Sequence, residues 1–262
     1  MVSIIISVKN NMCNLKKTLI SVLLQNCIEK VKIILVFNDN KTKKCYGDLI
    51  NIFSEKISLD CLVADNKNLR QFGLDRCKTK YVIFLKANDF FYDAFSVDCL
   101  FKEIDQKKSN FAFGEYVELN GNYGYSNINN YYLSINGKIF LVDFLKKKKS
   151  EITDDNDFDV EFVGKTFLST DKHCHIDNIV CVNNSFETDV LSNIKNIVDK
   201  TIEVYNLYAD KLNKVELSKY VFYNFNYLNS LFVHNLFYIT FEDFQKIITP
   251  LETLYRQLVK EV

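Results

Sequence analysis

The chain has 262 residues, enough to bury the core of one large domain or of a domain with an appendage. Lysine plus arginine and aspartate plus glutamate both number 33, and this zero net charge argues against nucleic acid as a partner. Eight cysteines without a C-x-x-C pair and the lack of an apolar run of ~18 residues argue against a disulfide framework and a membrane-spanning helix. We therefore expect a cytoplasmic protein, free or attached peripherally to the inner face of the membrane.

The first half of the chain alternates apolar strands with amphipathic helices. In chain order, we predict a strand at 2–8, a helix at 14–25, a strand at 32–37, a helix at 47–53, a strand at 60–64, a helix at 68–77, a strand at 81–85 and a helix at 94–105. Asn14 and Asn68 stand where they can cap the helices that follow them. Parallel strands connected by helices bind ligands at their carboxyl ends, so we expect a ligand site where the polar residues follow these strands.

The periodicity changes after this point. In chain order, we predict a strand at 111–119, a turn at 120–122, a helix at 139–148, a helix at 160–168, short strands at 173–176 and 179–182, and helices from about 188 to the end. The aromatic helices at the end should pack on the domain and on each other, with a dimer or membrane-surface contact as the alternative. His173 and His175 share a strand face without a third ligand in sequence reach, and we interpret them as structural rather than zinc-binding.

Three short segments of the first half place polar or charged residues at strand ends and helix starts. Residues 2–10 read V-S-I-I-I-S-V-K-N, with Ser7 near the end of the strand. Asn38 and Asp39 directly follow the second strand. The run L-R-Q-F-G-L places Arg70 in the first turn of a predicted helix.

Two further segments carry candidate acids. Residues 86–89 read K-A-N-D and directly follow the strand at 81–85. Asp159 stands at the start of a predicted helix, and the run H-I-D-N arrives at residues 175–178.

In this order and spacing, the five segments resemble the motifs of family 2 glycosyltransferases, which read V-S-I-I-I-P-V-Y-N, V-D-D, A-R-N-x-G-L, D-x-D-D, and E-D followed by Y-I-D-N. The resemblance extends from end to end of the chain. It implies the GT-A fold, an α/β fold in which helices flank a mostly parallel sheet, with an α-helical C-terminal region. The implied division is a glycosyltransferase domain at 1–186 and a helical region at 187–262.

The resemblance also implies an activity and its residues. Such an enzyme transfers a sugar to a glycan or lipid-linked acceptor in surface polysaccharide synthesis. We expect the donor to be a UDP-sugar and the transfer to invert the configuration of the sugar. Asp159 matches the position of the catalytic base, which takes the proton of the acceptor hydroxyl. The implied donor-binding residues are Ser7, Asn38, Asp39, Arg70, Lys86 and Asn88.

The metal motif departs from the family pattern. The family's D-x-D-D holds Mg²⁺ or Mn²⁺, because hard cations prefer carboxylate oxygens. Here Lys86 and Asn88 replace two of the acids, and Asp89 is retained. Three interpretations stay open: Asn88 and Asp89 form a weakened metal site, Lys86 supplies the positive charge without a metal, or the donor site is inactive. In the last case the chain would be a pseudo-glycosyltransferase that scaffolds an active enzyme or binds a glycan.

Overall fold

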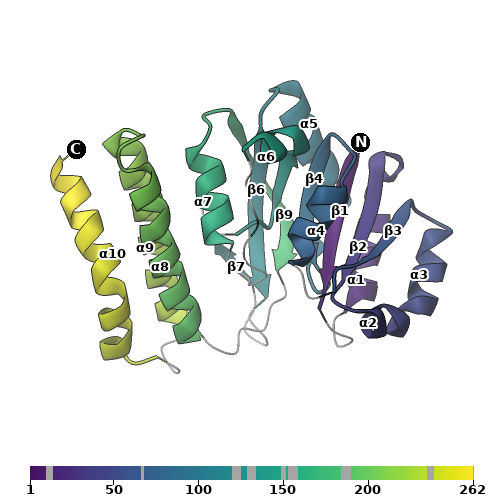
Figure 1. The fold of residues 1–262 in the computed structure, drawn as a ribbon, viewed down its shortest axis with the longest axis horizontal. Helices are drawn as coiled ribbons and strands as arrows, with labels where there is room; N and C mark the ends of the chain where they lie inside the picture. The colour runs from purple at the N-terminus through teal and green to yellow at the C-terminus, as the bar shows by residue number, and fades with distance from the viewer. Residues whose placement is uncertain are drawn as a thin grey trace. The chain divides into compact units, whose positions relative to one another are not determined.

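The computed structural model describes residues 1–9, 14–65, 68–119, 125–128, 134–148, 152, 159–183, 190–234 and 239–261. The chain divides into two units. The first contains Met1–Asn129, Ile135–Asp155 and Lys172–Phe186, and the second contains Asn130–Ser134, Asn156–Asp171 and Glu187–Val262. The first unit holds the sheet and the second holds the long C-terminal helices (Figure 1). The predicted boundary between residues 186 and 187 stays a prediction.

The first unit alternates strands and helices along most of its length. In chain order its first elements are β1 (Val2–Val8), α1 (Leu15–Leu23), a 3₁₀ turn (Ile28–Lys30), β2 (Val31–Phe37), α2 (Asn40–Cys45), α3 (Gly47–Ser54), β3 (Leu59–Val63), α4 (Leu69–Arg76), β4 (Tyr81–Lys86), β5 (Phe90–Phe91) and α5 (Ser96–Gln106). They are followed by β6 (Phe111–Leu119), β7 (Tyr125–Ile128), β8 (Lys138–Leu141), α6 (Val142–Lys148) and β9 (His173–Asn183). The strands and helices predicted up to residue 106 are confirmed with small shifts at their ends, whereas α2 and β5 were not predicted.

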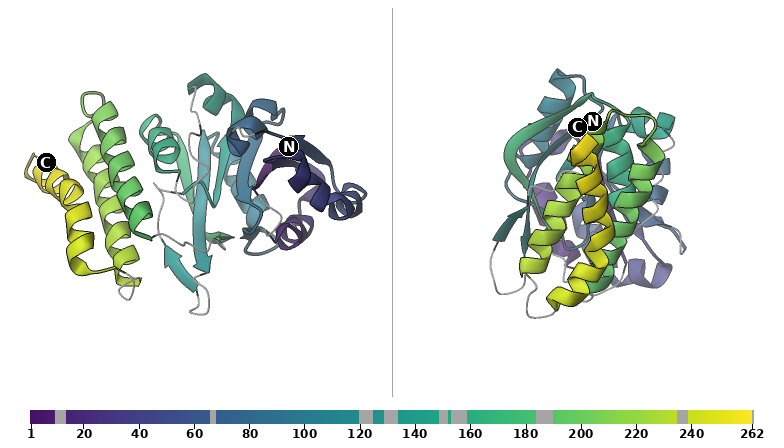
Figure 2. Two further views of the ribbon diagram at one scale, coloured as in Figure 1. Left: turned by 60° about the horizontal axis from the view of Figure 1, so that its bottom comes forward. Right: turned by 90° about the vertical axis from the view of Figure 1, so that its left-hand side faces the viewer.

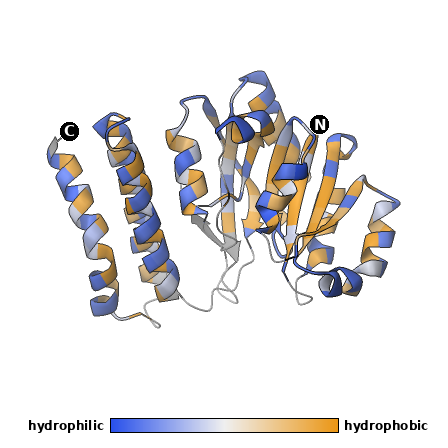
Figure 3. Cartoon of the chain, viewed as in Figure 1, coloured by the Kyte–Doolittle hydropathy of each residue, from blue (hydrophilic) through white to orange (hydrophobic). Residues whose placement is uncertain are grey.

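The described strands form one mixed sheet. Its order is β3-β2-β1-β4-β8-β6-β9-β5, and β7 pairs with β6. β3, β2, β1 and β4 run parallel, β8 is antiparallel to both of its neighbours, and β9 is parallel to β6. The strands β1, β2 and β4 are coloured as hydrophobic along most of their length in Figure 3, as expected for strands covered on both faces.

Helices pack on both faces of this sheet. On one face, Leu19 of α1 and Leu100 of α5 belong to a core that also contains Ile4 and Ile6 of β1. On the other face, α4 approaches β1 so closely that a Cβ atom on Gly73 would lie 2.7 Å from Ile5 Cγ2. Helix α4 returns from the carboxyl end of β3 to the amino end of β4, so its first turn lies at the carboxyl edge of the sheet (Figure 1).

One predicted helix begins too early. Residues 138–141 form strand β8 and not the start of the helix predicted at 139–148, and α6 begins only at Val142. The strand pairs with β4 on one side and with β6 on the other, and this pairing buries Ile139 and Phe140 completely. A short apolar run does not distinguish a buried strand from a helix. Here the run forms a strand because it pairs with β4 and β6. The predicted turn at 120–122 lies outside the described residues.

A single strand, β9, replaces the two short strands predicted between residues 173 and 182. It pairs with β6 along its length, and the register shifts midway, as at a β-bulge. His173 stacks on Phe111 with 5.2 Å between ring centroids, and His175 lies 5.0 Å from Phe113 by the same measure. These ring contacts along the strand support the structural interpretation of both histidines.

The second unit consists of helices. They are α7 (Val160–Leu168), α8 (Val190–Tyr208), α9 (Lys214–His234) and α10 (Phe241–Glu261). The last three run side by side in both views of Figure 2, and Phe232 of α9 stacks on Phe244 of α10 with 4.3 Å between ring centroids. The predictions of a helix at 160–168 and of a helical C-terminal region are confirmed. Within the described part of the chain, no helix has the length and apolar character needed to cross a membrane.

Candidate functional site

The carboxyl ends of three neighbouring strands meet at one edge of the sheet. Ser7 of β1 lies opposite Lys86 of β4 in the strand register, and the N–H group of Ala87 donates to Ser7 O at 3.1 Å. Asn38 follows β2, and its N–H group donates to Val8 O at 3.2 Å. The structure thus brings three predicted donor-binding residues to one edge, Ser7, Asn38 and Lys86.

Asn38 and Asp39 share a hydrogen bond that fixes the orientation of the asparagine. Asp39 caps α2 by accepting the Thr42 N–H at 2.6 Å, and this bond lowers the pKa of the Asp39 carboxyl. Its other oxygen accepts from Asn38 Nδ2 at 2.9 Å. A carboxylate can only accept, so the NH₂ of Asn38 must face Asp39 and the amide oxygen must face away.

The amide oxygen of Asn38 is a buried acceptor that these contacts leave unused. Within the described residues, Asn38 Oδ1 has no hydrogen-bond partner and no exposed surface. Buried polar atoms are almost always hydrogen-bonded, to protein, water or a ligand, so this acceptor is open to an N–H or O–H group from one of these sources. Asp39, which the family resemblance also places among the donor-binding residues, has both carboxylate oxygens engaged, one in the helix cap and one in the contact with Asn38.

Arg70 is positioned by the start of helix α4. Asn68 caps this helix by accepting the Gln71 N–H at 2.9 Å, as the sequence predicts. Arg70 follows within the first turn, and only 1% of its surface is exposed. A guanidinium group in such a position is poorly screened by solvent, and its planar arrangement of N–H donors is of a kind that suits anionic oxygens.

Arg70 and Lys86 lie on the same face of the sheet. Gly73 packs over Ile5, so Arg70, one turn earlier in α4, lies nearer to the carboxyl edge on that face. Side chains alternate along a strand, so Ser7 is on the face of Ile5, and Lys86, its partner in β4, shares that face. The edge therefore combines a hydroxyl and two cations on the side that α4 covers.

In the turn at residues 86–89, the side chains of Asn88 and Asp89 both accept hydrogen bonds from backbone N–H groups. Asn88 Oδ1 accepts the N–H of Asn14 at 2.6 Å, just where Asn14 caps helix α1. Asp89 is fully buried, and its Oδ2 accepts the N–H of Lys86 at 3.2 Å, while its own N–H donates to Lys86 O at 3.1 Å. Both side chains predicted as metal ligands therefore hold parts of the first unit together.

This turn does not fit a divalent cation. Mg²⁺ and Mn²⁺ need several hard oxygen ligands, most of them charged or freely oriented. The turn offers two such side chains. The carboxylate of Asp89 is buried and accepts a backbone N–H group, and the amide oxygen of Asn88 accepts another. Lys86, at the start of the same turn, adds a positive charge to this segment. In the described part of the chain, moreover, no three His, Cys, Asp or Glu side chains are grouped as a metal site.

A buried lysine that sequence reasoning missed lies in the same part of the core. Lys138 begins β8 with 1% of its surface exposed, and its Nζ donates to Asn136 O at 3.4 Å. Burial raises the pKa of the Cys181 thiol well above its usual range; the charge of Asp89 adds to this rise and that of Lys138 opposes it. In the sequence, a single lysine before the apolar run gave no sign of burial, because lysines at such positions are usually solvated.

The candidate base, Asp159, belongs to the second unit. It occupies the N-cap position of α7, and its carbonyl oxygen accepts the N–H of Val163 at 2.8 Å. The side chain makes no capping hydrogen bond to the described residues, and 2% of Asp159 is exposed. The carboxylate therefore stands at the N-terminus of α7, where its charge also suits the helix dipole.

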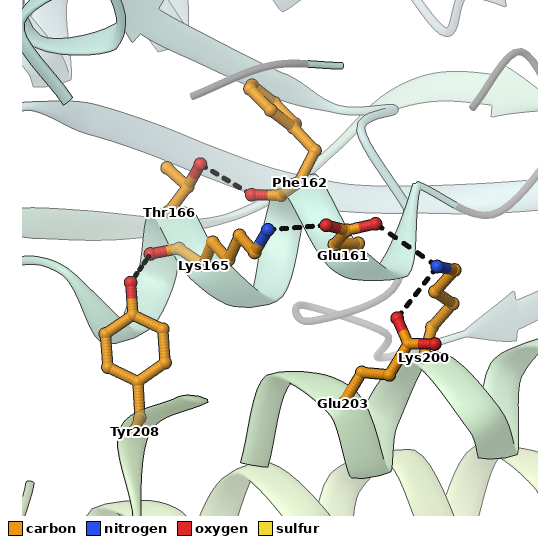
Figure 4. A network of polar contacts seen from close by, with 7 residues as sticks. All are labelled: Glu161, Phe162, Lys165, Thr166, Lys200, Glu203 and Tyr208. Carbon is orange, nitrogen blue, oxygen red and sulfur yellow. Dashed lines mark hydrogen bonds and ion pairs between the residues drawn. The ribbon is translucent and has the colours of Figure 1, made fainter. Parts of the chain in front are cut away.

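Polar contacts fix the helix that carries the candidate base. Glu161 forms ion pairs with Lys165 at 2.5 Å on its own helix and with Lys200 of α8 at 3.4 Å. The hydroxyl of Tyr208 in α8 donates to Lys165 O at 3.3 Å. Figure 4 shows this network between α7 and α8, with Glu203 as a second partner of Lys200. The N-terminus of α7 is thereby held in one orientation within its unit.

Comparison with known proteins relates the chain to others through structure alone. No protein-family model matches the sequence, and no curated protein is similar to it at a significant level. The structure of residues 1–349 of TarS from S. aureus in complex with UDP-GlcNAc is similar with a TM-score of 0.68 at 13% identity, over 95% of this chain and 80% of that one. A longer TarS structure has a TM-score of 0.61 at 14% identity, over 84% of this chain and 42% of that one.

A second similar structure is that of the mannosyltransferase PcManGT from Pyrobaculum calidifontis in complex with GDP-Man and Mn²⁺. It has a TM-score of 0.61 at 11% identity, over 98% of this chain and 84% of that one. At such identities the similarity shows the fold. The chain has the GT-A fold that the sequence motifs predict.

Proposed function

We propose that the protein is a glycosyltransferase that moves a sugar from a nucleotide-sugar, in the first place a UDP-sugar, to a glycan or lipid-linked acceptor. The observation that carries the proposal is the buried, unused acceptor Asn38 Oδ1 at the carboxyl edge of a GT-A sheet. A nucleobase such as uracil presents an N–H group that satisfies this atom. Arg70 and Lys86, which lie at the same edge of the sheet, suit the diphosphate that follows the nucleoside.

The proposed reaction inverts the configuration of the sugar. The acceptor hydroxyl oxygen attacks the anomeric carbon while the bond from that carbon to the diphosphate oxygen breaks, and the nucleoside diphosphate leaves with the bonding electron pair. Asp159 takes the hydroxyl proton as general base. Ser7 and Asp39 would complete the donor site, Ser7 through its hydroxyl and Asp39 by orienting Asn38.

The proposed setting is surface polysaccharide synthesis at the cytoplasmic face of the membrane. The C-terminal helices expose several large apolar side chains, and these support a contact with a second copy or with the membrane surface. The exposed residues are Leu207, Val215, Phe222, Tyr223, Val233, Phe241 and Val259.

Replacing Asn38 by alanine should weaken UDP binding about 5- to 10-fold, because one neutral hydrogen bond is worth about 1 kcal/mol. Titration calorimetry with UDP on wild type and Asn38→Ala measures the effect. Asn51→Ala, which changes an exposed asparagine of α3, is the matched control and should bind as wild type does. Equal affinities of wild type and Asn38→Ala would refute the role of Asn38. Failure of wild type to bind UDP or GDP would refute the proposed function.

A pseudo-glycosyltransferase is the second candidate, favoured by the closed turn at residues 86–89 and the loss of two carboxylates there. Such a protein would scaffold an active partner or bind a glycan. A panel of nucleotide-sugars, each incubated with and without glycan acceptors, separates the two candidates. Release of nucleoside diphosphate above the buffer rate supports the enzyme, whereas UDP binding without release from any donor supports the scaffold.

A further inference from the structure

In the turn that follows β4, both side chains that could bind a metal already accept hydrogen bonds from the backbone. Rotating Asn88 toward a cation would remove the acceptor from the Asn14 N–H at the start of α1. Withdrawing Asp89 would break its bond to the Lys86 N–H and expose a fully buried carboxylate. Recruiting either side chain as a metal ligand would therefore cost part of the fold of this unit.

The residues after the turn also oppose such a rearrangement. Phe90 and Phe91 form β5, which pairs antiparallel with Val182 and Cys181 of β9. Asp89 directly precedes this pair, so its backbone is held between β4 and β9. Lys138, at the start of β8, is buried as Asp89 is, with 1% of its surface exposed. The carboxylate thus belongs to the core and does not project from the sheet edge.

Positive charge is already present at the edge where a cation would act. Lys86 ends β4 opposite Ser7, and Arg70 lies on the same face at the start of α4. The Lys86 Nζ atom and Arg70 are both shielded from water. Charges in such places are screened less than surface charges, so they attract an anion more strongly and repel a divalent cation more strongly.

We propose that this edge binds the diphosphate of a nucleotide without a divalent cation, and that Lys86 and Arg70 supply the positive charge. The inference rests on the proposed function, because it concerns the same nucleotide site. It names the leaving-group chemistry of that site: an ammonium and a guanidinium group stabilise the negative charge that develops on the departing diphosphate.

Titration calorimetry of UDP, with GDP in a parallel series, tests the inference on the full chain. Wild type should bind with a Kd in EDTA that lies within about twofold of its Kd in Mn²⁺. Lys86→Met should weaken binding in EDTA by about 10- to 100-fold, the range for one charged hydrogen bond, and Lys86→Arg should restore most of it. Lys16→Met, which removes an exposed lysine of α1, should bind as wild type does.

The salt dependence gives a second readout that a purely structural role of Lys86 would not change. Affinity in EDTA should fall with rising ionic strength in wild type and fall less steeply in Lys86→Met. Binding that requires Mn²⁺, or unchanged affinity and salt dependence in a folded Lys86→Met protein, would overturn the inference and leave the proposed function standing. Failure of both nucleotides to bind wild type in EDTA and in Mn²⁺ would overturn both.

Discussion

Asp159→Asn should release UDP from the best UDP-sugar donor about 10²- to 10⁴-fold more slowly than wild type, because general base catalysis contributes rate factors of that size. Asparagine preserves the volume of the aspartate but cannot take the acceptor proton. The Kd for UDP should stay unchanged, since the base acts on the acceptor. A coupled assay of UDP release measures the rate, and calorimetry measures the affinity.

The control for this variant is Asp171→Asn, which removes the charge of an exposed aspartate in the same unit. It should retain the wild-type rate. If Asp159→Asn keeps the wild-type rate as well, Asp159 is not the base. If the variant loses UDP affinity along with the rate, its effect reaches the donor and the assignment also fails.

Gly73→Val should lower the free energy of unfolding by about 2–3 kcal/mol, the usual cost of forcing extra atoms into a packed core. The new Cβ would lie 2.7 Å from Ile5 Cγ2 and 3.1 Å from Val36 Cγ2, so α4 must move away from the sheet. Because Arg70 stands one turn earlier in the same helix, the folded variant should also bind UDP more weakly. Urea unfolding followed by circular dichroism measures the stability, and calorimetry on the folded protein measures the affinity.

Gly47→Ala is the glycine control for that measurement. A Cβ atom on Gly47 would meet nothing within 4 Å, and the residue begins α3. Alanine there should leave the stability unchanged or raise it by up to about 1 kcal/mol, because it restricts the unfolded chain. Equal unfolding curves for Gly73→Val and wild type would show that α4 does not pack on β1 as described.

The parts of the fold that the sequence predicts well are those that local patterns determine. An uninterrupted apolar run identified β4, and Asn14 and Asn68 cap the helices that their positions suggested. Strand β8 could not be identified in this way, because its partners β4 and β6 lie far from it in the chain. Helix α2 was missed for a related reason: its residues are mostly polar, and its start depends on the cap provided by Asp39.

The candidate site shows the same division. The order of the motifs was enough to place Ser7, Asn38 and Lys86 at one edge of the sheet. The roles of the atoms were not accessible from sequence, because they depend on contacts between distant residues. The hydrogen bond from the Asn14 N–H group to Asn88 Oδ1 joins positions 74 residues apart. In this bond, the amide oxygen that the sequence offers as a metal ligand contacts the start of α1 instead.

That same bond makes one amide proton an indicator of events at the sheet edge. The N–H of Asn14 is held by a side chain of another segment, so its exchange with deuterium from solvent requires the two segments to separate. A nucleotide that held the turn at residues 86–89 in place would slow this exchange, while one that opened the turn would accelerate it. The NMR resonance of this one amide proton would then report whether an unlabelled nucleotide is bound at the edge of the sheet. The measurement needs no knowledge of the sugar or the acceptor.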